Sequence, residues 1–130
     1  MIKKKIEIPQ EKKKEWLHYK KGLTQRDLNK KLILKSKYEL YHLLSKRMAD
    51  LLYQTYKVKK VYLIGSLLKF EFFHSHSDID LVVEGLRAED YFSAVVELEK
   101  ITNGEPFHLI DINDVSQEFK SKIINTGKLL

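Results

Sequence analysis

A long segment without glycine or proline is the strongest constraint on what this chain can form. From Thr24 to Tyr56 neither residue occurs, and these two interrupt helices most often. Thr24 and Asp27 have the spacing of a helix-starting capping box. Apolar and aromatic residues then recur at helical spacing, at Tyr38, Tyr41, Leu44, Met48, Leu51, Leu52 and Tyr56. The pattern predicts an amphipathic helix of about 30 residues, roughly 45 Å long.

After Lys57 the pattern changes to short apolar segments that alternate with turn residues. β-Branched runs predict strands over residues 58–64, 79–83 and 107–112. Helices are expected over 67–73, 88–101 and 115–124. Strands that alternate with helices indicate an α/β fold. We therefore expect an N-terminal helical extension over residues 1–57 and an α/β domain over 58–130.

Composition excludes several protein classes. The chain has 130 residues, the size of one compact domain, and no cysteine, so a disulfide scaffold, a thiolate metal site and a thiol nucleophile are all excluded. No apolar run approaches the ~18 residues of a membrane span, and the basic start leads into Pro9 without the apolar core of a signal peptide. The expected location is the cytoplasm, without membrane association.

Charge is distributed unevenly along the chain. Residues 1–60 contain 18 Lys/Arg and 6 Asp/Glu, whereas residues 61–130 contain 6 Lys/Arg and 12 Asp/Glu. The lysine runs at 12–14, 20–21 and 30–31 are interleaved with aromatic residues. Such a segment can be a solvated face over a packed stripe, a surface that docks a protein, or a nucleic-acid contact.

Asp78 and Asp80 carry the chemistry of the second half of the chain. Residues two apart in a strand point to the same face, so both carboxylates converge while Ile79 and Leu81 turn to the apolar side. Carboxylates placed together repel unless a cation lies between them. Mg²⁺ prefers oxygen ligands and completes its shell with substrate phosphates. Two such ions can hold the attacking and leaving oxygens of a phosphoryl displacement.

Gly65 and Ser66 follow the first predicted strand and precede a predicted helix. Glycine allows a phosphate to approach the backbone, and free N–H groups at a helix start, with the serine hydroxyl, can bind it. A nucleoside triphosphate would then lie between this turn and the strand that carries the aspartates. The residues by themselves indicate a metal–phosphate site.

The run Gly65-Ser66…Ser77-Asp78-Ile79-Asp80-Leu81 resembles the nucleotidyltransferase superfamily related to DNA polymerase β. Over residues 58–130 the chain is most similar to the minimal nucleotidyltransferases (MNT proteins). Glu84-Gly85-Leu86 and the closing pattern Ile123…Gly127…Leu130 belong to the same resemblance. It implies a small mixed β-sheet of nucleotidyltransferase type with flanking helices, preceded here by the long N-terminal helix.

The resemblance also implies cofactors, partners and roles. Two Mg²⁺ ions would be bound by Asp78, Asp80 and a third strand carboxylate, with ATP or another nucleoside triphosphate as substrate. Nucleotide binding falls to Gly65, Ser66, Lys69 and Ser77. Many such proteins are antitoxins of HEPN-domain toxins, and some transfer AMP to a toxin tyrosine. The reacting hydroxyl would then belong to the partner.

Three positions depart from the pattern of the family. Eleven residues separate Ser66 from Asp78, one more than usual, and Lys69 follows the turn where arginine is expected. The segment Ile110-Asp111-Ile112 has the apolar-Asp-apolar form of the third strand and makes Asp111 the candidate third ligand and general base. Counting back from Gly127, however, puts the third carboxylate at His108. Residues 108 and 111 lie on opposite strand faces, so only one of them can reach the metals.

We therefore expect a metal-dependent nucleotidyltransferase that moves a nucleoside monophosphate, AMP from ATP, to a protein hydroxyl as the antitoxin of a HEPN toxin. Two alternatives stay open. One is a catalytically degenerate antitoxin that acts by binding alone. The other is an RNA-binding regulator that uses the basic helices. Self-association is also left open.

Overall fold

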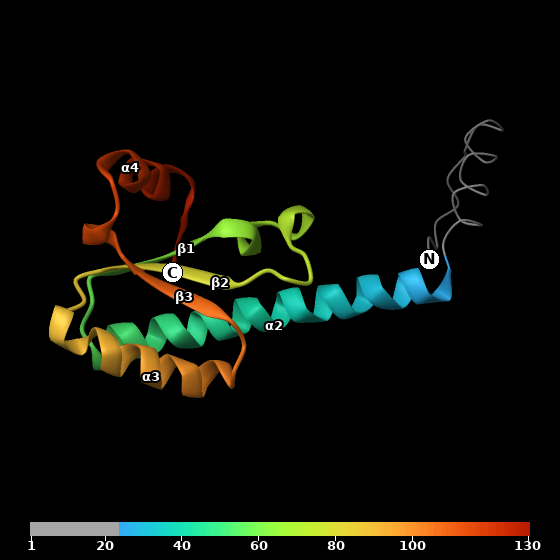
Figure 1. The fold of residues 1–130 in the computed structure, drawn as a ribbon, viewed down its shortest axis with the longest axis horizontal. Coiled ribbons are helices and arrows are strands. Elements are labelled where there is room, and N and C mark those ends of the chain that lie inside the picture. Colours follow the sequence, from blue (N-terminus) through green and yellow to red (C-terminus); the bar gives the residue numbers. More distant parts are fainter. Residues whose placement is uncertain (1–23) are drawn as a thin grey trace, which may run out of the picture. The chain divides into compact units, whose positions relative to one another are not determined.

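The computed structural model describes residues 24–130. The chain divides into two units, Met1–Ile33 and Leu34–Leu130. The second unit holds a four-stranded sheet with helices on both of its faces (Figure 1). The lysine runs at 12–14 and 20–21 lie outside the described residues, whereas Lys30 and Lys31 are exposed on a helix.

Helix α2 (Gln25–Thr55) confirms the predicted long helix and its start. The Thr24 backbone N–H donates to Asp27 Oδ2 at 3.2 Å, and the Asp27 N–H donates to Thr24 Oγ1 at 3.1 Å. This reciprocal pair is a capping box. The predicted apolar stripe is fully buried at Tyr41, Met48 and Leu52.

The sheet has the strand order β3-β2-β1-β4 and is mixed, as predicted. Strand β1 (Lys60–Ile64) pairs antiparallel with β2 (Ile79–Glu84) and with β4 (Lys128–Leu129). Strand β2 pairs in parallel with β3 (Phe107–Asp111). Helix α3 (Tyr91–Thr102) connects β2 to β3, and α4 (Gln117–Thr126) precedes β4.

Alternation along the strands separates two cores. Ile79, Leu81 and Val83 are fully buried in the larger core, which α2 and α3 share with the sheet. Tyr62 and Val82 point to the opposite face, where they form a smaller core with Ile112 and Ile123. Asp78 and Asp80 are half-buried outside the larger core, so the predicted separation of these carboxylates from Ile79 and Leu81 is found.

The second half of α2 is part of the same core as the sheet. Its buried residues are Tyr41, Leu44, Ser45, Met48, Ala49 and Leu52. The described compact unit accordingly begins at Leu34, within this helix. The predicted division between residues 57 and 58 stays a prediction, and it falls just beyond the end of α2.

The segment between β1 and β2 differs from the predicted helix over 67–73. It contains two short 3₁₀ helices, η1 (Gly65–Leu68) and η2 (Phe70–Phe72), separated by Lys69 in an extended conformation. Two further 3₁₀ turns, η3 (Ala88–Asp90) and η4 (Ile112–Asp114), precede α3 and follow β3. Among residues 24–130, no helix has the combination of length and apolarity that crossing a membrane requires.

Candidate functional site

Asp78 and Asp80 lie at the start of β2, on the sheet face opposite α2 and α3. Their side chains are 32% and 30% exposed, so both can be reached from solvent while the strand beneath them is buried. Asp80 pairs in register with Ile64, the last residue of β1. This register brings the carboxylate of Asp80 next to the turn that follows β1.

His108 completes the group. It is the parallel register partner of Asp80, so both side chains emerge on the same face of neighbouring strands. Nδ1 of His108 lies 2.8 Å from Asp80 Oδ1 and 3.7 Å from Asp78 Oδ2. One ligand atom from each of the three residues lies within 4.8 Å of the other two. Within residues 24–130, these three side chains form a group that could hold a metal ion.

Asp111 is not brought to this group. It pairs with Val83, three residues or about 10 Å further along the sheet than the pair of Asp80 and His108. Its Oδ1 accepts a hydrogen bond of 2.9 Å from the Asn113 N–H at the start of η4. The role predicted for Asp111 as third ligand and general base therefore has no support from its position. His108 occupies the place that counting back from Gly127 indicated.

Gly65 forms the turn beside Asp80. Its φ of +84° is in the left-handed region, and a Cβ atom at this position would lie 2.8 Å from Asp80 Oδ2. Residues with a side chain adopt this backbone conformation only with strain. The glycine predicted from the Gly-Ser motif is thus required both by the backbone and by the approach of the carboxylate.

Ser66 and Ser77 tie the turn to the segment before Asp78. The Ser66 hydroxyl donates to Ser77 Oγ at 2.7 Å, and the His74 N–H donates to the same oxygen at 2.9 Å. Ser77 is only 2% exposed. Its side chain therefore stabilises the eleven-residue loop through hydrogen bonds at both of its ends. The contact with a nucleotide that the sequence predicts for Ser77 stays a prediction.

Lys69 and Gly65 are among the residues that line a cavity of about 520 Å³. Lys122 of α4 supplies a second ammonium group to the same cavity. The remaining lining is largely apolar and comes from the turn, η2 and α4, with Ile64, Leu68, Phe72, Phe119, Ile123 and Thr126. Lys122 and Phe119 were missed at the level of sequence, because only the packing of α4 over the sheet brings them to the turn.

Two polar contacts connect helix α2 to segments that carry or adjoin the site residues. The His42 Nε2 lies 2.8 Å from the Leu67 carbonyl, which can only accept, so Nε2 carries the proton. Burial lowers the pKa of His42, and nearby Lys128 adds to this effect against the raising influence of the Leu67 carbonyl. The ring is therefore neutral at pH 7 and holds η1 to the helix.

Tyr41 makes the second contact. Its hydroxyl donates to Glu105 Oε1 at 2.7 Å, which connects α2 to the loop before β3. Burial raises the pKa of Tyr41, and the hydrogen bond to the Glu105 carboxylate raises it further, so the phenol stays protonated. Neither residue was identified as a support from the sequence, which placed Tyr41 in the apolar stripe and gave His42 no role.

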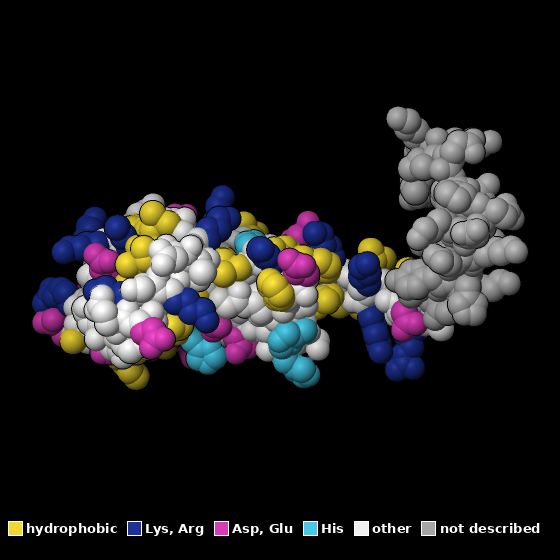
Figure 2. Space-filling model, turned by 90° about the horizontal axis from the view of Figure 1, so that it is seen from above, with side chains coloured by type: hydrophobic (Ala, Val, Ile, Leu, Met, Phe, Trp, Pro, Cys, Tyr) yellow, Lys and Arg dark blue, Asp and Glu magenta, His cyan; other side chains and the backbone are white. Residues whose placement is uncertain are grey.

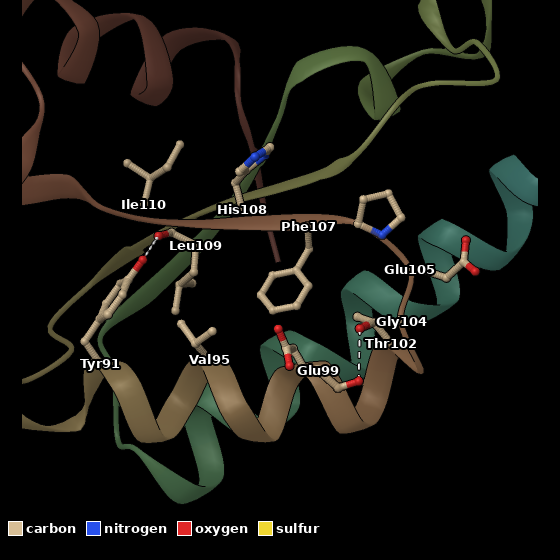
Figure 3. A pocket seen from close by; sticks show the side chains of 11 residues that line it. Tyr91, Val95, Glu99, Thr102, Gly104, Glu105, Phe107, His108, Leu109 and Ile110 are labelled. Carbon is tan, nitrogen blue, oxygen red and sulfur yellow. Dashed lines mark hydrogen bonds between the residues drawn. The ribbon is translucent and has the colours of Figure 1, made fainter.

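A second cavity, of about 560 Å³, lies between α3 and the outer edge of β3 (Figure 3). Figure 3 shows Phe107 and Leu109 pointing toward α3, while His108 points to the opposite side of the strand. Tyr91 closes one end through a hydrogen bond of 2.6 Å to the Leu109 carbonyl. Phe107 and Leu109 thus line the cavity from the α3 side of the sheet, while His108, which also lines it, contacts Asp80.

Charged side chains outside the site form no single patch on the face that Figure 2 shows. Lysine and arginine side chains are spread over the described part of this face with acidic side chains between them, and histidines lie near acidic groups. His74 and His76 are exposed, and His74 Nδ1 accepts from the His76 N–H at 3.2 Å. They do not join the group of Asp78, Asp80 and His108.

Comparison with known proteins identifies the fold of the site-bearing region. Residues 46–130 match the family described as Polymerase beta, Nucleotidyltransferase. A solved structure, the crystal structure of the toxin-antitoxin MntA-HepT, aligns with 68% of this chain and 69% of its own chain, at 21% identity and a TM-score of 0.48. A structural similarity of this size is no basis for assigning a function. No curated protein matches the chain.

Proposed function

The chain belongs to the polymerase beta nucleotidyltransferase family, and on that premise we propose that it is a metal-dependent nucleotidyltransferase that moves AMP from ATP to a hydroxyl of a partner protein. The observation that carries the proposal is the placement of Asp78 and Asp80 on one strand face, directly beside the turn of Gly65. A phosphate bound at that turn would lie against the two carboxylates.

The carboxylates and His108 fit a divalent cation. They offer two anionic oxygens and one imidazole nitrogen from adjacent strands, with solvent on the open side. Mg²⁺ is the ion that the family resemblance implies, and such ions typically keep positions for substrate phosphates. A bound cation would neutralise phosphate charge and polarise the reacting phosphorus.

The cavity next to Gly65 provides the second half of a nucleotide site. Lys69 and Lys122 would balance the charge of the β- and γ-phosphates, and the apolar lining suits a base or ribose. In the reaction, the acceptor oxygen bonds to the α-phosphorus as the bond to the β-phosphate oxygen breaks and pyrophosphate leaves. The acceptor proton passes to solvent water, since Asp111, the base predicted from the sequence, is not brought to the carboxylate pair.

The proposed acceptor is a HEPN-domain toxin, which the modification would silence in the cytoplasm. Support comes from the resemblance of residues 58–130 to minimal nucleotidyltransferases. The toxin would supply the reacting hydroxyl, so this chain needs only to hold and orient the triphosphate.

The test is calorimetric titration of the full chain with ATP, with and without Mg²⁺, for the wild type and for Asp78→Ala/Asp80→Ala. We expect metal-dependent binding that the double variant loses by about 100-fold or more, because both anionic ligands are gone. Asp50→Ala, an exposed aspartate on α2, is the matched control and should bind as the wild type does. Wild-type affinity in the double variant would refute the site.

A second candidate function is an antitoxin that neutralises its toxin by binding alone. The observation that favours it is His108 in the place of the third carboxylate. The two functions separate in a co-expression experiment with the toxin. If Asp78→Ala/Asp80→Ala still neutralises the toxin, binding suffices, whereas loss of neutralisation with intact complex formation requires the transfer.

A further inference from the structure

We infer that His108 is a metal ligand, and that it makes this site select a first-row transition-metal dication, Mn²⁺, over Mg²⁺. The inference rests on the proposed function, because it concerns the cation held by the same two carboxylates. It goes beyond that function in naming a nitrogen donor and the metal preference that follows from it.

His108 Nδ1 and Asp80 Oδ1 are hydrogen-bonded to each other, and a cation bound by both atoms would take the place of the shared proton. Nδ1, and not the outward part of the ring, faces both carboxylates, at 2.8 Å from Asp80 Oδ1 and 3.7 Å from Asp78 Oδ2. Two ligands that each lie about 2.1 Å from a common cation are at most about 4.2 Å apart. The three ligand atoms already lie within 4.8 Å of one another, so small side-chain rotations would close them around an ion.

The backbone holds these three donors in place. Asp80 and His108 are register partners on paired strands, and Ile79 between the two aspartates is fully buried in the core. On the outer side the ring is exposed, at 63% of the side chain, so water and phosphate oxygens can fill the remaining positions of an ion. The backbone therefore positions three donor side chains, and the solvent-facing side of the site stays open to further ligands.

The chemistry of the donor set decides the preference. Mg²⁺ strongly favours oxygen and releases its waters reluctantly, so an imidazole in place of a carboxylate weakens its binding. Mn²⁺ binds carboxylate and water oxygens, and first-row dications also accept imidazole nitrogen. Two carboxylates with one imidazole, without a thiolate, form a mixed set that suits Mn²⁺ better than Mg²⁺.

The test compares MnCl₂ and MgCl₂ in calorimetric titrations of the full chain, alone and with a non-hydrolysable ATP analogue. For the wild type we expect Mn²⁺ to bind at least about 10-fold more tightly than Mg²⁺. His108→Asp restores the carboxylate and should lower this ratio about 10-fold, mainly by strengthening Mg²⁺ binding. His108→Asn should weaken Mn²⁺ without any gain for Mg²⁺.

A spectroscopic measurement reads the ligand directly. Electron spin-echo modulation of bound Mn²⁺ should show coupling to an imidazole nitrogen in the wild type and lose it in His108→Asp. Circular dichroism of each variant verifies that the fold is retained. An unchanged Mn²⁺ to Mg²⁺ ratio in His108→Asp, or the absence of nitrogen coupling in the wild type, overturns the inference.

The same titrations separate this inference from the proposed function. If Asp78→Ala/Asp80→Ala loses both ions while His108→Asp leaves the ratio unchanged, the cation site stands and the role of His108 fails. If the wild type binds neither ion even with the nucleotide analogue, both the inference and the proposed function fail.

Discussion

At the residue scale, Gly65 couples the backbone of the turn to the geometry of the carboxylates. Two features require glycine at this position: the positive φ, and the closeness of Asp80 Oδ2 to the place that a Cβ atom would take. Substitution tests whether the second feature affects metal binding. Gly104 is a matched comparison, because its φ of +89° is similar but nothing lies within 4 Å of a Cβ atom there. The difference between the two positions isolates the contact with Asp80.

We predict that Gly65→Ala weakens metal–nucleotide binding by at least about 10-fold, whereas Gly104→Ala leaves it unchanged. Both variants should lose about 1 kcal/mol or more of the free energy of unfolding through backbone strain. Calorimetric titration and urea unfolding of both variants provide the two readouts. Equal loss of binding in the two variants would mean that strain, and not displacement of Asp80, causes the effect.

The residue scale also shows how far the sequence could predict the site. Strand alternation predicts from the sequence that Asp78 and Asp80 share a face, and the Gly-Ser pair marks the turn after β1, whereas the positive φ of Gly65 is visible only in the structure. The choice between His108 and Asp111 was not local. It depends on the register between β2 and β3, which pairs Asp80 with residue 108.

At the element scale, α2 is a support for the turn of the site as well as a core helix. His42 reaches from α2 to the Leu67 carbonyl in η1, and Tyr38 packs edge-on against the His42 ring at a centroid distance of 4.5 Å. The positive charge of Lys128 in β4 also lowers the pKa of this histidine. Protonation of the ring would place a cation in a partly buried site next to a lysine.

This arrangement predicts a pH dependence of stability. Burial holds the folded-state pKa of His42 below 6.5, so the unfolded chain binds the proton more readily. The contribution of His42 to the free energy of unfolding is therefore complete above pH 6.5 and is lost as the pH falls through the folded pKa. His42→Gln should show a smaller fall between pH 7.5 and 5.5 than the wild type does.

Urea unfolding at several pH values measures this difference. His76→Gln is the control, since His76 is exposed and its backbone N–H donates to His74 Nδ1. It should retain the pH dependence of the wild type. Identical pH profiles for His42→Gln and the wild type would contradict a role of His42 in this dependence.

Elements that carry a periodic pattern were predictable, and short ones were not. The long helix, its capping box and three strands follow from spacing and β-branched composition. Strand β4 has two residues, too few for any pattern, and it exists because β1 offers it an edge. The η1 and η2 turns replaced the predicted helix because Lys69 adopts an extended conformation between them.

At the scale of the whole molecule, the second half of α2 and the sheet share one hydrophobic core. Met48 is fully buried in it, together with Leu63 and Leu81 from the two central strands. Conversely, Leu43 on the same helix is about half exposed. A domain that began only at residue 58 would leave the sheet face under α2 uncovered, so helix and sheet should unfold together.

We predict that Met48→Ala lowers the free energy of unfolding by about 2–5 kcal/mol, because a buried thioether side chain is lost and a cavity remains. Leu43→Ala should cost far less, since that leucine is already half in water. Hydrogen exchange should show the loss of protection in β1 and β2 as well as in α2, because one core stabilises all three. If Met48→Ala accelerated exchange in the helix alone, the sheet would be stable without α2 and the boundary between residues 57 and 58 would be the real one.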